Sequence, residues 1–428
     1  MRRFGAVLLG GLWGLAASAT AQEIAYAPTP PPPPGSSTCP GGICQPEALS
    51  GLFEALAAAG AGGREHPVHV LQIGDSHTAG DGLTGKLRAD LQARFGSGGR
   101  GALPAGPPYP GYAPFHVELA AEGWSTEVAP LHALRRRNAG FGLASVRGRA
   151  GPGQLEFRLE PGSEVRQVGV CGWPRGGGDG VIIDPGNDEP WPINLNPTSD
   201  DGSACITFPL ARPASSIRIS GVGSGATIAS VWLEGDPSGV VVSGLGLTGA
   251  TLRDLASRSD DLVSGELAIW KTTLLVLAFG TNEGFDPDLD PVAYERLLRD
   301  QIERMRRLGP FDMSLMILGA PDALRNGAVD GCSVDGQRAP PPSLALVRDV
   351  QRRVAADMGV AFWDWHGRMG GDCSADRLAS MADPLMRPDR VHFTGAGAGW
   401  IGGVLSADLL AAYDAWKADA GPATGGVD

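Results

Sequence analysis

Two widely separated segments carry residues whose types and spacing suit nucleophilic catalysis. Ser76 follows a glycine and an aspartate directly after an apolar run, and Asp389 stands three residues before His392. A serine hydroxyl attacks well when a nearby base takes its proton, and a histidine serves as that base when a carboxylate fixes its tautomer. We therefore predict that Ser76 is a nucleophile, His392 its base and Asp389 the residue that orients the base.

Each of these residues also has a structural explanation. Ser76 could cap the helix that follows it, because serine is among the preferred cap residues. His392 could be an ordinary structural histidine, and Asp389 could belong to a turn after Pro388. The nucleophile elbow of α/β-hydrolases is not met, because Thr78 stands where its second glycine is needed. Only the combination of the three residues favours catalysis.

Two further segments offer hydrogen-bond donors for the negative charge that develops in such a reaction. A glycine-rich run at 244–251 contains Gly249, and the segment after the apolar run at 272–279 contains Asn282. Both follow strand-like runs, so both should open onto the same edge of a sheet as Ser76. We predict that the backbone N–H groups of Ser76 and Gly249 and the side-chain amide of Asn282 surround a developing oxyanion.

The glycine-rich run has one competing interpretation. Gly244, Gly246 and Gly249 fit the G-x-G-x-x-G pattern of dinucleotide-binding loops. Such a site needs an acidic residue about 20 positions later, at the end of the next strand. The next strand-like run ends at Phe279 without one, so we expect no nicotinamide cofactor.

The residues around these segments alternate between strand-like and helix-like patterns. Strands are predicted at 68–73, 272–279, 313–318 and 360–363, and helices at 47–59, 83–95, 291–308, 344–358 and 399–416. Strands that alternate with helices of this length form a parallel sheet covered by helices. The predicted fold class is therefore α/β, with the candidate residues at strand ends.

Between the two α/β parts, residues 107–238 change in character. Apolar and polar residues alternate with the period of a strand, glycine is frequent and helix-period runs are absent. We predict an inserted β-sandwich here. Trp124, Trp173 and Trp191 are expected in its core, with stacking on sugar rings as the alternative. The acidic stretch at 179–201 matches no calcium-binding loop template.

Composition excludes several classes of protein. The chain has 428 residues, of which 43% are hydrophobic, which is enough for a sizeable core. Its 64 glycines and 35 prolines argue against an all-helical bundle. The net charge of −12 lacks the basic footprint of a nucleic-acid binder, so no nucleic-acid partner is expected.

The two ends of the chain differ from the folded parts. A basic start, an apolar stretch and an A-x-A site predict a signal peptide at 1–21. A proline-rich linker is predicted at 22–44 and a flexible tail at 419–428. The parts that flank the insert are then 45–106 and 239–418. We expect a soluble periplasmic protein without a membrane span.

Six cysteines agree with export to an oxidising compartment. Proximity along the chain favours the pairs Cys39 with Cys44, Cys171 with Cys205, and Cys332 with Cys373. A zinc site is the alternative, but the chain has no C-x-x-C pair and its histidines are not spaced as paired ligands. We therefore expect disulfides, and neither a metal nor an organic cofactor.

Taken together, four separated segments resemble the four sequence blocks of the SGNH (GDSL-type) hydrolase superfamily. They are Gly-Asp-Ser around Ser76, the glycine block around Gly249, Gly-x-Asn around Asn282, and Asp-x-x-His ending at His392. The resemblance implies a flavodoxin-like, three-layer fold with a parallel sheet. It also implies Ser76 as nucleophile, His392 as base, Asp389 as its orienting residue, and Ser76, Gly249 and Asn282 as the oxyanion hole.

Details of the blocks narrow this resemblance. The chain resembles exported bacterial peptidoglycan O-acetylesterases in three details: the first block reads Gly-Asp-Ser-His-Thr-Ala, the third reads Gly-Thr-Asn-Glu, and a β-rich insert follows the first block. In those enzymes the insert is a jelly-roll carbohydrate-binding-type module. The similarity implies a serine esterase that removes O-acetyl groups from a cell-wall glycan, with an O-acetylated polysaccharide such as peptidoglycan as its partner. The alternatives are a glycan O-acetyltransferase with the same triad and a non-catalytic glycan-binding protein with a vestigial hydrolase domain.

Four residues near these blocks have supporting or competing roles. His77 and Glu283 are expected to support their loops, although His77 lies beside the nucleophile and could contact substrate. Asp364 and His366 follow the predicted strand at 360–363 but lack the Asp-x-x-His spacing. We interpret these last two as ordinary strand-end residues.

Overall fold

The computed structural model describes residues 30–131, 140–150, 153–174, 180–222, 225–327 and 331–419. The predicted signal peptide at 1–21, linker residues 22–29 and tail residues 420–428 lie outside the described residues. So does Asp179, the first residue of the acidic stretch considered for calcium.

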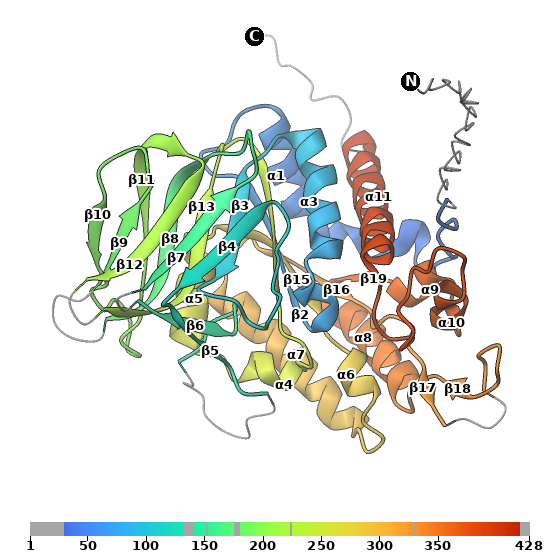
Figure 1. Cartoon of the computed structure of the whole chain (residues 1–428). Helices are drawn as coiled ribbons and strands as arrows, with labels where there is room; N and C mark the ends of the chain where they lie inside the picture. The colour runs from blue at the N-terminus through green and yellow to red at the C-terminus, as the bar shows by residue number, and fades with distance from the viewer. Residues whose placement is uncertain are drawn as a thin grey trace, which may run out of the picture. The chain divides into compact units, whose positions relative to one another are not determined.

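A six-stranded sheet forms the centre of the α/β part (Figure 1). In spatial order its strands are β14 (Val240–Gly246), β2 (Val68–Gly74), β15 (Thr272–Ala278), β16 (Ser314–Leu318), β19 (Ala361–Trp363) and β1 (Ile43–Cys44). All neighbours pair in parallel except β1, which is antiparallel to β19. Numbered along the chain, the five parallel strands have the flavodoxin-like order 2-1-3-4-5, whose switch point lies between the first and third strands.

Helices cover both faces of this sheet, which gives three layers (Figure 1). One face is covered by α1 (Ser50–Gly60), α3 (Gly82–Phe95) and α11 (Gly395–Asp419), and the other by α5 (Asp260–Ile269), α7 (Pro291–Leu308) and α8 (Leu344–Met358). Strand residues alternate accordingly: Leu274 and Val276 of β15 pack with the first group, and Leu275 and Leu277 with the second. The predicted α/β class and parallel sheet are therefore confirmed.

Short elements lie around the sheet, several of them directly after its strands. They are η1 (Pro40–Gly42), η2 (Pro46–Leu49), α2 (Ser76–Ala79), α4 (Leu252–Ala256), α6 (Thr281–Gly284), α9 (Trp365–Met369), α10 (Ser374–Ala379), β17 (Arg325–Asn326) and β18 (Arg338–Ala339). Of these, α2, α4 and α6 follow β2, β14 and β15, so they carry the segments in which the candidate site residues were predicted.

Two antiparallel sheets occupy most of the chain between β2 and β14. One sheet contains β4 (Val117–Glu122), β7 (Gln154–Leu159), β12 (Ser216–Val222), β9 (Gly180–Asp184) and β10 (Trp191–Asn194); the other contains β3 (Gly99–Pro104), β5 (Ser125–Val128), β6 (Val146–Arg149), β13 (Ala226–Glu234), β8 (Val165–Pro174) and β11 (Ala204–Ala214). Apolar residues of both sheets, such as Phe157, Val170 and Ile219, are buried in one shared core. The chain thus has the inserted β-sandwich that the alternating pattern predicted, while the domain boundaries stay a prediction.

The two ends of this β-rich segment meet at the edge of the main sheet. Gly98 N–H donates to Val240 O at 2.9 Å, and Val240 N–H donates to Gly96 O at 2.9 Å. One strand of the sandwich comes from the predicted first α/β part: β3 pairs with β13. This pairing depends on a partner far along the chain, so no local pattern indicates it.

Part of the predicted linker is packed against the α/β part. Gly35 N–H donates to Arg368 O at 2.8 Å, and Thr38 N–H donates to Asp364 Oδ2 at 2.7 Å. Ile43 is buried and belongs to the edge strand β1. The folded region therefore includes residues that the proline-rich composition assigned to a tether.

The three predicted disulfides are all present. They join Cys39 to Cys44, Cys171 to Cys205, and Cys332 to Cys373. Proximity along the chain was a sufficient guide because each pair lies in neighbouring strands or adjacent loops. Three disulfides indicate an extracytoplasmic protein.

The tryptophans of the insert differ in burial. Trp124 is buried, and its Nε1 donates to Ala105 O at 2.9 Å, as expected of a core residue. Trp173 and Trp191 are only half-buried. The predicted core position is therefore confirmed for Trp124 and does not hold for the other two.

Helix α11 is long and apolar enough, by length and composition, to cross a membrane, and it is the one such helix among the described residues. Its residues Ile401, Leu405 and Leu409 are fully buried in the core that also contains α1 and α3. Packing in that core accounts for the apolar composition of α11.

Candidate active site

The predicted site residues follow three neighbouring strands of the main sheet. Gly74, the last residue of β2, pairs in register with the last residues of both β14 and β15. Ser76 follows β2, Gly249 follows β14 and Asn282 follows β15. Because the carboxyl ends of parallel strands meet at one edge, these three residues lie at the switch point of the sheet.

Ser76, His392 and Asp389 form a continuous chain of polar contacts. Ser76 Oγ lies 3.0 Å from His392 Nε2, although the two residues are 316 positions apart in the sequence. On the other side of the ring, His392 Nδ1 lies 2.9 Å from Asp389 Oδ2. This is the order of groups that lets a histidine take a proton from a serine.

Asp389 is held in its ionised form by the residues that follow it. Its Oδ1 accepts the backbone N–H of Val391 at 2.9 Å and of His392 at 3.0 Å. Partial burial acts to raise the pKa of Asp389, but these bonds and the His392 ring outweigh it and lower the pKa below its ordinary value. A carboxylate beside Nδ1 favours the tautomer protonated there, which leaves Nε2 free to accept the proton of Ser76.

Close packing shapes the turn that carries Ser76. Asp75 caps α2 by accepting a hydrogen bond from His77 N–H at 3.0 Å, and burial raises the pKa of Asp75 to about 6. Strand β14 runs directly beside this turn: a Cβ on Gly246 would lie 2.2 Å from Ala79 N. Glycine at this position therefore permits the approach that holds the turn against the sheet.

The predicted oxyanion donors have N–H groups to offer. Within the described part of the chain, the N–H groups of Ser76 and Gly249 donate to no other residue. Gly249 has a φ of +81°, in the left-handed region that favours glycine. Asn282 Nδ2 donates to Ala250 O at 2.8 Å, and an amide group has a second N–H in addition to the one used there.

His77 packs against the candidate base. Its ring centroid lies 5.7 Å from that of His392, 5.4 Å from Trp365 and 5.7 Å from Phe393. Burial lowers the pKa of His77 to about 3, so this ring adds no positive charge beside His392. The contacts agree with the expected supporting role, and His77 also lines the cavity in front of Ser76.

A buried carboxylate holds the loop that carries Asp389 and His392. Arg390 lies between them with a φ of +57°, and its Nε donates to Asp376 Oδ1 at 3.0 Å. Asp376 is 3% exposed, so its charge is balanced within the protein. The sequence analysis missed Asp376, because it lies on α10 and stands outside the Asp-x-x-His block.

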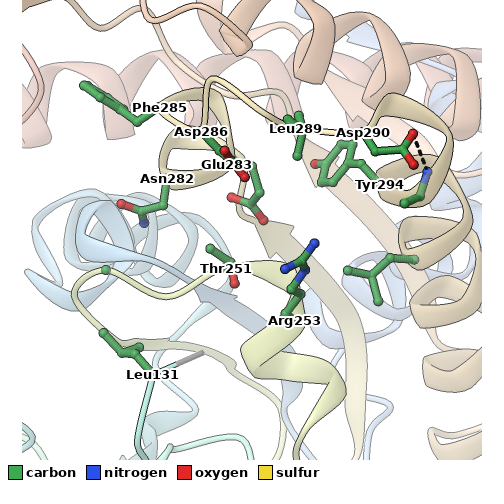
Figure 2. Close-up of a pocket in the computed structure, with 13 residues that line it drawn as sticks. Leu131, Thr251, Arg253, Asn282, Glu283, Phe285, Asp286, Leu289, Asp290 and Tyr294 are labelled. Carbon is green, nitrogen blue, oxygen red and sulfur yellow. Dashed lines mark hydrogen bonds between the residues drawn. The ribbon is translucent and has the colours of Figure 1, made fainter. Parts of the chain in front are cut away.

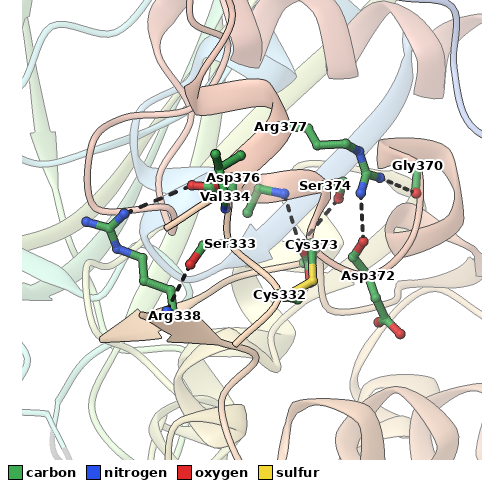
Figure 3. Close-up of a disulfide and its surroundings, with 12 residues drawn as sticks. Cys332, Ser333, Val334, Arg338, Gly370, Asp372, Cys373, Ser374, Asp376 and Arg377 are labelled. Carbon is green, nitrogen blue, oxygen red and sulfur yellow. Dashed lines mark hydrogen bonds and ion pairs between the residues drawn. A yellow bond between two sulfur atoms is a disulfide. The ribbon is translucent and has the colours of Figure 1, made fainter. Parts of the chain in front are cut away.

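The same carboxylate lies close to the disulfide between Cys332 and Cys373 (Figure 3). Asp376 Oδ2 accepts a hydrogen bond from Val334 N–H at 2.9 Å. Val334 follows Cys332 closely in the chain, and Asp376 follows Cys373, so the Cys332–Cys373 bond fixes both partners. The disulfide therefore stabilises the position of Asp376, whose contact with Arg390 holds the loop of the candidate base.

Two cavities flank the glycine-rich loop. A cavity of about 340 Å³ is lined by Ser76 and His392, and one of about 500 Å³ is lined by Gly249 and Asn282 (Figure 2). Thr248 lines the first cavity and the adjacent Gly249 the second. The loop after β14 thus lies between the two spaces.

A buried ion cluster, also missed by sequence reasoning, supports the Ser76 cavity. Asp81 accepts hydrogen bonds from Arg88 Nη2 at 2.9 Å and Arg100 Nη2 at 2.8 Å. It also accepts from the N–H of Phe115 at 2.9 Å, and Phe115 lines the cavity. Asp81 directly precedes α3 and Arg88 lies in its middle, but Arg100 lies on β3 and Phe115 follows β3, so no local pattern predicts the cluster.

Asp364 and His366 lie outside the chain of contacts from Ser76. Asp364 caps α9 by accepting Gly367 N–H at 3.0 Å, and His366 Nε2 lies 2.9 Å from Asp372 Oδ1. Both therefore contribute to the local structure after β19, as expected of residues that lack the Asp-x-x-His spacing.

Glu283 joins the loops after β14 and β15. Its Oε1 accepts the N–H of Leu252 at 2.8 Å, in agreement with the expected supporting role. Burial raises the pKa of Glu283 to about 7.

Comparison with known proteins finds similarity at the level of structure. No protein-family model and no curated protein matches the chain. A solved structure of a peptidoglycan O-acetylesterase matches with a TM-score of 0.74 and 24% identity, over 87% of this chain and 99% of that chain.

Two other solved structures are more distant. The acetyl xylan esterase AlAXEase matches with a TM-score of 0.29 and 14% identity, over 39% of this chain and 78% of that chain. An active-site mutant of a family two carbohydrate esterase from Clostridium thermocellum matches with a TM-score of 0.28 and 11% identity, over 67% of this chain and 98% of that chain. TM-scores this low do not establish a shared fold. The likeness to the peptidoglycan O-acetylesterase does, because it spans nearly all of both chains. The chain therefore has the same fold as that peptidoglycan O-acetylesterase.

Proposed function

We propose that this protein is a serine esterase that removes O-acetyl groups from a cell-wall glycan, with peptidoglycan as the leading substrate. The observation that carries the proposal is the pair of contacts from Ser76 Oγ to His392 and from His392 to Asp389, at 3.0 and 2.9 Å. A serine, a histidine and a carboxylate in this order, at the switch point of an α/β sheet, are the machinery of acyl transfer.

In the proposed reaction, Ser76 Oγ attacks the ester carbonyl carbon while His392 Nε2 takes its proton. The N–H groups of Ser76 and Gly249 and the amide of Asn282 stabilise the oxyanion. His392, held by Asp389, then donates the proton to the departing sugar oxygen, which leaves an acetyl group on Ser76. Water, deprotonated by His392, attacks this acyl-enzyme, and collapse of the second tetrahedral intermediate releases acetate and restores the serine.

Peptidoglycan is favoured by two lines of support. A solved structure that shares this fold is a peptidoglycan O-acetylesterase. Three disulfides suit an extracytoplasmic compartment, and we propose that the signal-like residues 1–21 direct the chain to the periplasm, where peptidoglycan is found.

The proposal is tested by measuring acetate released from O-acetylated peptidoglycan, from acetylated xylan and from an aryl acetate. We expect release from peptidoglycan at the highest kcat/KM, and a loss of at least about 10³-fold in Ser76→Ala. Ser50→Ala is a matched control, because Ser50 is exposed on α1 and its hydroxyl bonds to no described residue.

Two results would overturn the proposal. One is an Ser76→Ala protein that releases acetate as fast as its parent, which would remove Ser76 as nucleophile. The other is a parent protein that hydrolyses the aryl acetate but releases no acetate from any glycan, which would remove the substrate class and leave a general esterase.

A further inference from the structure

The cavity of about 500 Å³ beside Gly249 and Asn282 has no part in the proposed proton transfers. It lies across the glycine-rich loop from the Ser76 cavity and is bounded by α4, α6 and the start of α7 (Figure 2). A space of this size is in the range of ligand sites. The polar groups that line this cavity indicate which part of a substrate the cavity would bind.

One wall of this cavity carries a hydrogen-bond acceptor without a partner. Glu283 is 7% exposed, and while its Oε1 accepts Leu252 N–H, its buried Oε2 has no hydrogen-bond partner. Figure 2 shows the carboxyl directed into the cavity, toward Thr251 and Arg253. An unsatisfied buried oxygen costs free energy, which a ligand N–H would recover.

A hydrogen-bond donor faces this acceptor. Arg253, on α4, extends its guanidinium into the same space (Figure 2). Within the described part of the chain Arg253 has no hydrogen bond and no ion pair, and it does not pair with Glu283. The cavity thus presents an acceptor and a donor that do not satisfy each other.

The rest of the lining is largely apolar or already bonded. Apolar side chains come from Leu131, Phe285, Leu289 and Leu297. Asp290 also lines the cavity, but its Oδ1 caps α7 by accepting Val292 N–H at 2.9 Å and Ala293 N–H. At the α4 side of the cavity a ligand group therefore meets the free acceptor of Glu283, the free donor of Arg253 and an apolar surface, while the N–H groups of Gly249 and Asn282 and the carboxylate of Asp286 line its other parts.

This combination selects among chemical groups. A carboxylate only accepts hydrogen bonds and would leave Glu283 Oε2 unsatisfied, while an ammonium only donates and would be repelled by Arg253. In a trans secondary amide, N–H and C=O point in opposite directions, so one planar group can bridge a facing acceptor and donor. An acetamido group adds a methyl that suits the apolar surface.

We propose that this cavity binds the N-acetyl group of an amino sugar in the substrate, its N–H donating to Glu283 Oε2 and its carbonyl accepting from Arg253. The inference rests on the proposed function and names a feature of the substrate: a glycan of N-acetylated amino sugars. Xylan and cellulose carry a hydroxyl where such a sugar carries its acetamido group; a hydroxyl also donates and accepts, but only through a single oxygen atom, and it has no methyl group for the apolar surface. Glu283 and Arg253 are then specificity residues of the same site.

The test is equilibrium binding of two unacetylated oligosaccharides to the intact protein, measured by calorimetry. Chitotriose and cellotriose share the same β-1,4 linkage and differ in the acetamido group. We expect the parent to bind chitotriose at least about 10-fold more tightly, the value of one good hydrogen bond. Arg253→Met and Glu283→Gln should each remove most of this preference: methionine has no N–H for the ligand carbonyl, and the glutamine, whose oxygen accepts Leu252 N–H, turns an amide donor toward the ligand N–H. Arg296→Met is the matched control, since Arg296 is exposed on α7 and does not line the cavity.

Equal binding of the two sugars by the parent would overturn the inference, as would a preference that survives in Arg253→Met. Arg253 is exposed, so its variant tests the inference even where Glu283→Gln is poorly folded. Failure of the proposed function has a different signature. Loss of ester hydrolysis in the parent leaves the binding preference intact, whereas failure of this inference leaves Ser76-dependent acetate release intact.

Discussion

Replacing Asp376 by asparagine should slow catalysis without touching a catalytic residue. Asp376 holds Arg390, which lies between Asp389 and His392, through a contact of 3.0 Å. Asparagine keeps the size of the side chain and removes its charge. Arg390 then loses its buried counter-ion, and the positive φ of this residue is no longer held in place.

The size of the effect follows from burial and distance. Removing one member of a buried ion pair costs about 3–5 kcal/mol. The Arg390 side chain is 17% exposed and can recover part of this through water, so we expect a loss of about 2–3 kcal/mol in the free energy of unfolding. A displacement of about 1 Å at a catalytic group costs up to about 10²-fold in rate, so kcat should fall by roughly 10- to 100-fold.

The assay compares kcat and KM for an aryl acetate, well below the melting temperature, with stability from chemical denaturation. We expect kcat to fall in Asp376→Asn while KM is unchanged, because Asp376 acts through His392 and does not contact substrate. Asp335→Asn is the control: Asp335 is exposed, follows Val334 in the chain and pairs with Arg338, but it bonds to no residue of the Asp389 loop. A variant that loses stability yet keeps the parent kcat would refute the reasoning.

Three further expectations follow from other parts of the structure. Burial raises the pKa of Glu266, on α5, from its ordinary 4.5 to about 7, so the folded protein binds this proton more tightly than the unfolded chain does. The contribution of Glu266 to the free energy of unfolding is therefore greatest below pH 4.5 and falls by up to about 3 kcal/mol as the pH rises to 7. Urea titrations across that range should show a flatter slope in Glu266→Gln, and an unchanged slope would contradict the assignment. Gly249→Ala should lower kcat by about 10- to 100-fold, because alanine is strained at φ +81° and its Cβ would lie 3.1 Å from Leu131 Cδ1; steady-state rates equal to the parent's would count against the donor role. Replacing Cys332 and Cys373 together by serine should lower the free energy of unfolding by about 3–4 kcal/mol and should also lower kcat. Thermal melts and aryl acetate turnover measure the two effects. An unaffected kcat would show that His392 is held in place without the disulfide.

The elements that could be predicted are those whose signals are local. Helix α7 was expected at 291–308 and begins and ends there, because Pro291 suits the first turn, Asp290 caps it and the apolar residues repeat with the helical period. The contact of Asp389 with His392 was likewise open to prediction, since a spacing of three lets one loop deliver both side chains.

The features that could not be predicted depend on partners far apart in the sequence. The pairing of β3 with the sandwich and the packing of residues 35–44 are of this kind. So is the cavity of Glu283 and Arg253: the loop-supporting role of Glu283 could be inferred from its block, but the unpartnered Oε2 emerges only when α4 and α6 come together. Periodicity and motif spacing describe neighbours along the chain, and these sites are made of neighbours in space.

The two ends of the β-rich segment meet at Gly98 and Val240, so the chain leaves the α/β part and returns to it at neighbouring points. The segment is also joined to α5 by hydrogen bonds such as Leu143 N–H to Glu266 and Asp201 N–H to Asp261. A segment of different length could be grafted at these ends, provided that it kept the contacts with α5. Yet the present segment contributes Phe115 to one cavity and Leu131 to the other. Exchange of this segment would therefore reshape a wall of each cavity and leave the contacts among Ser76, His392 and Asp389 in place.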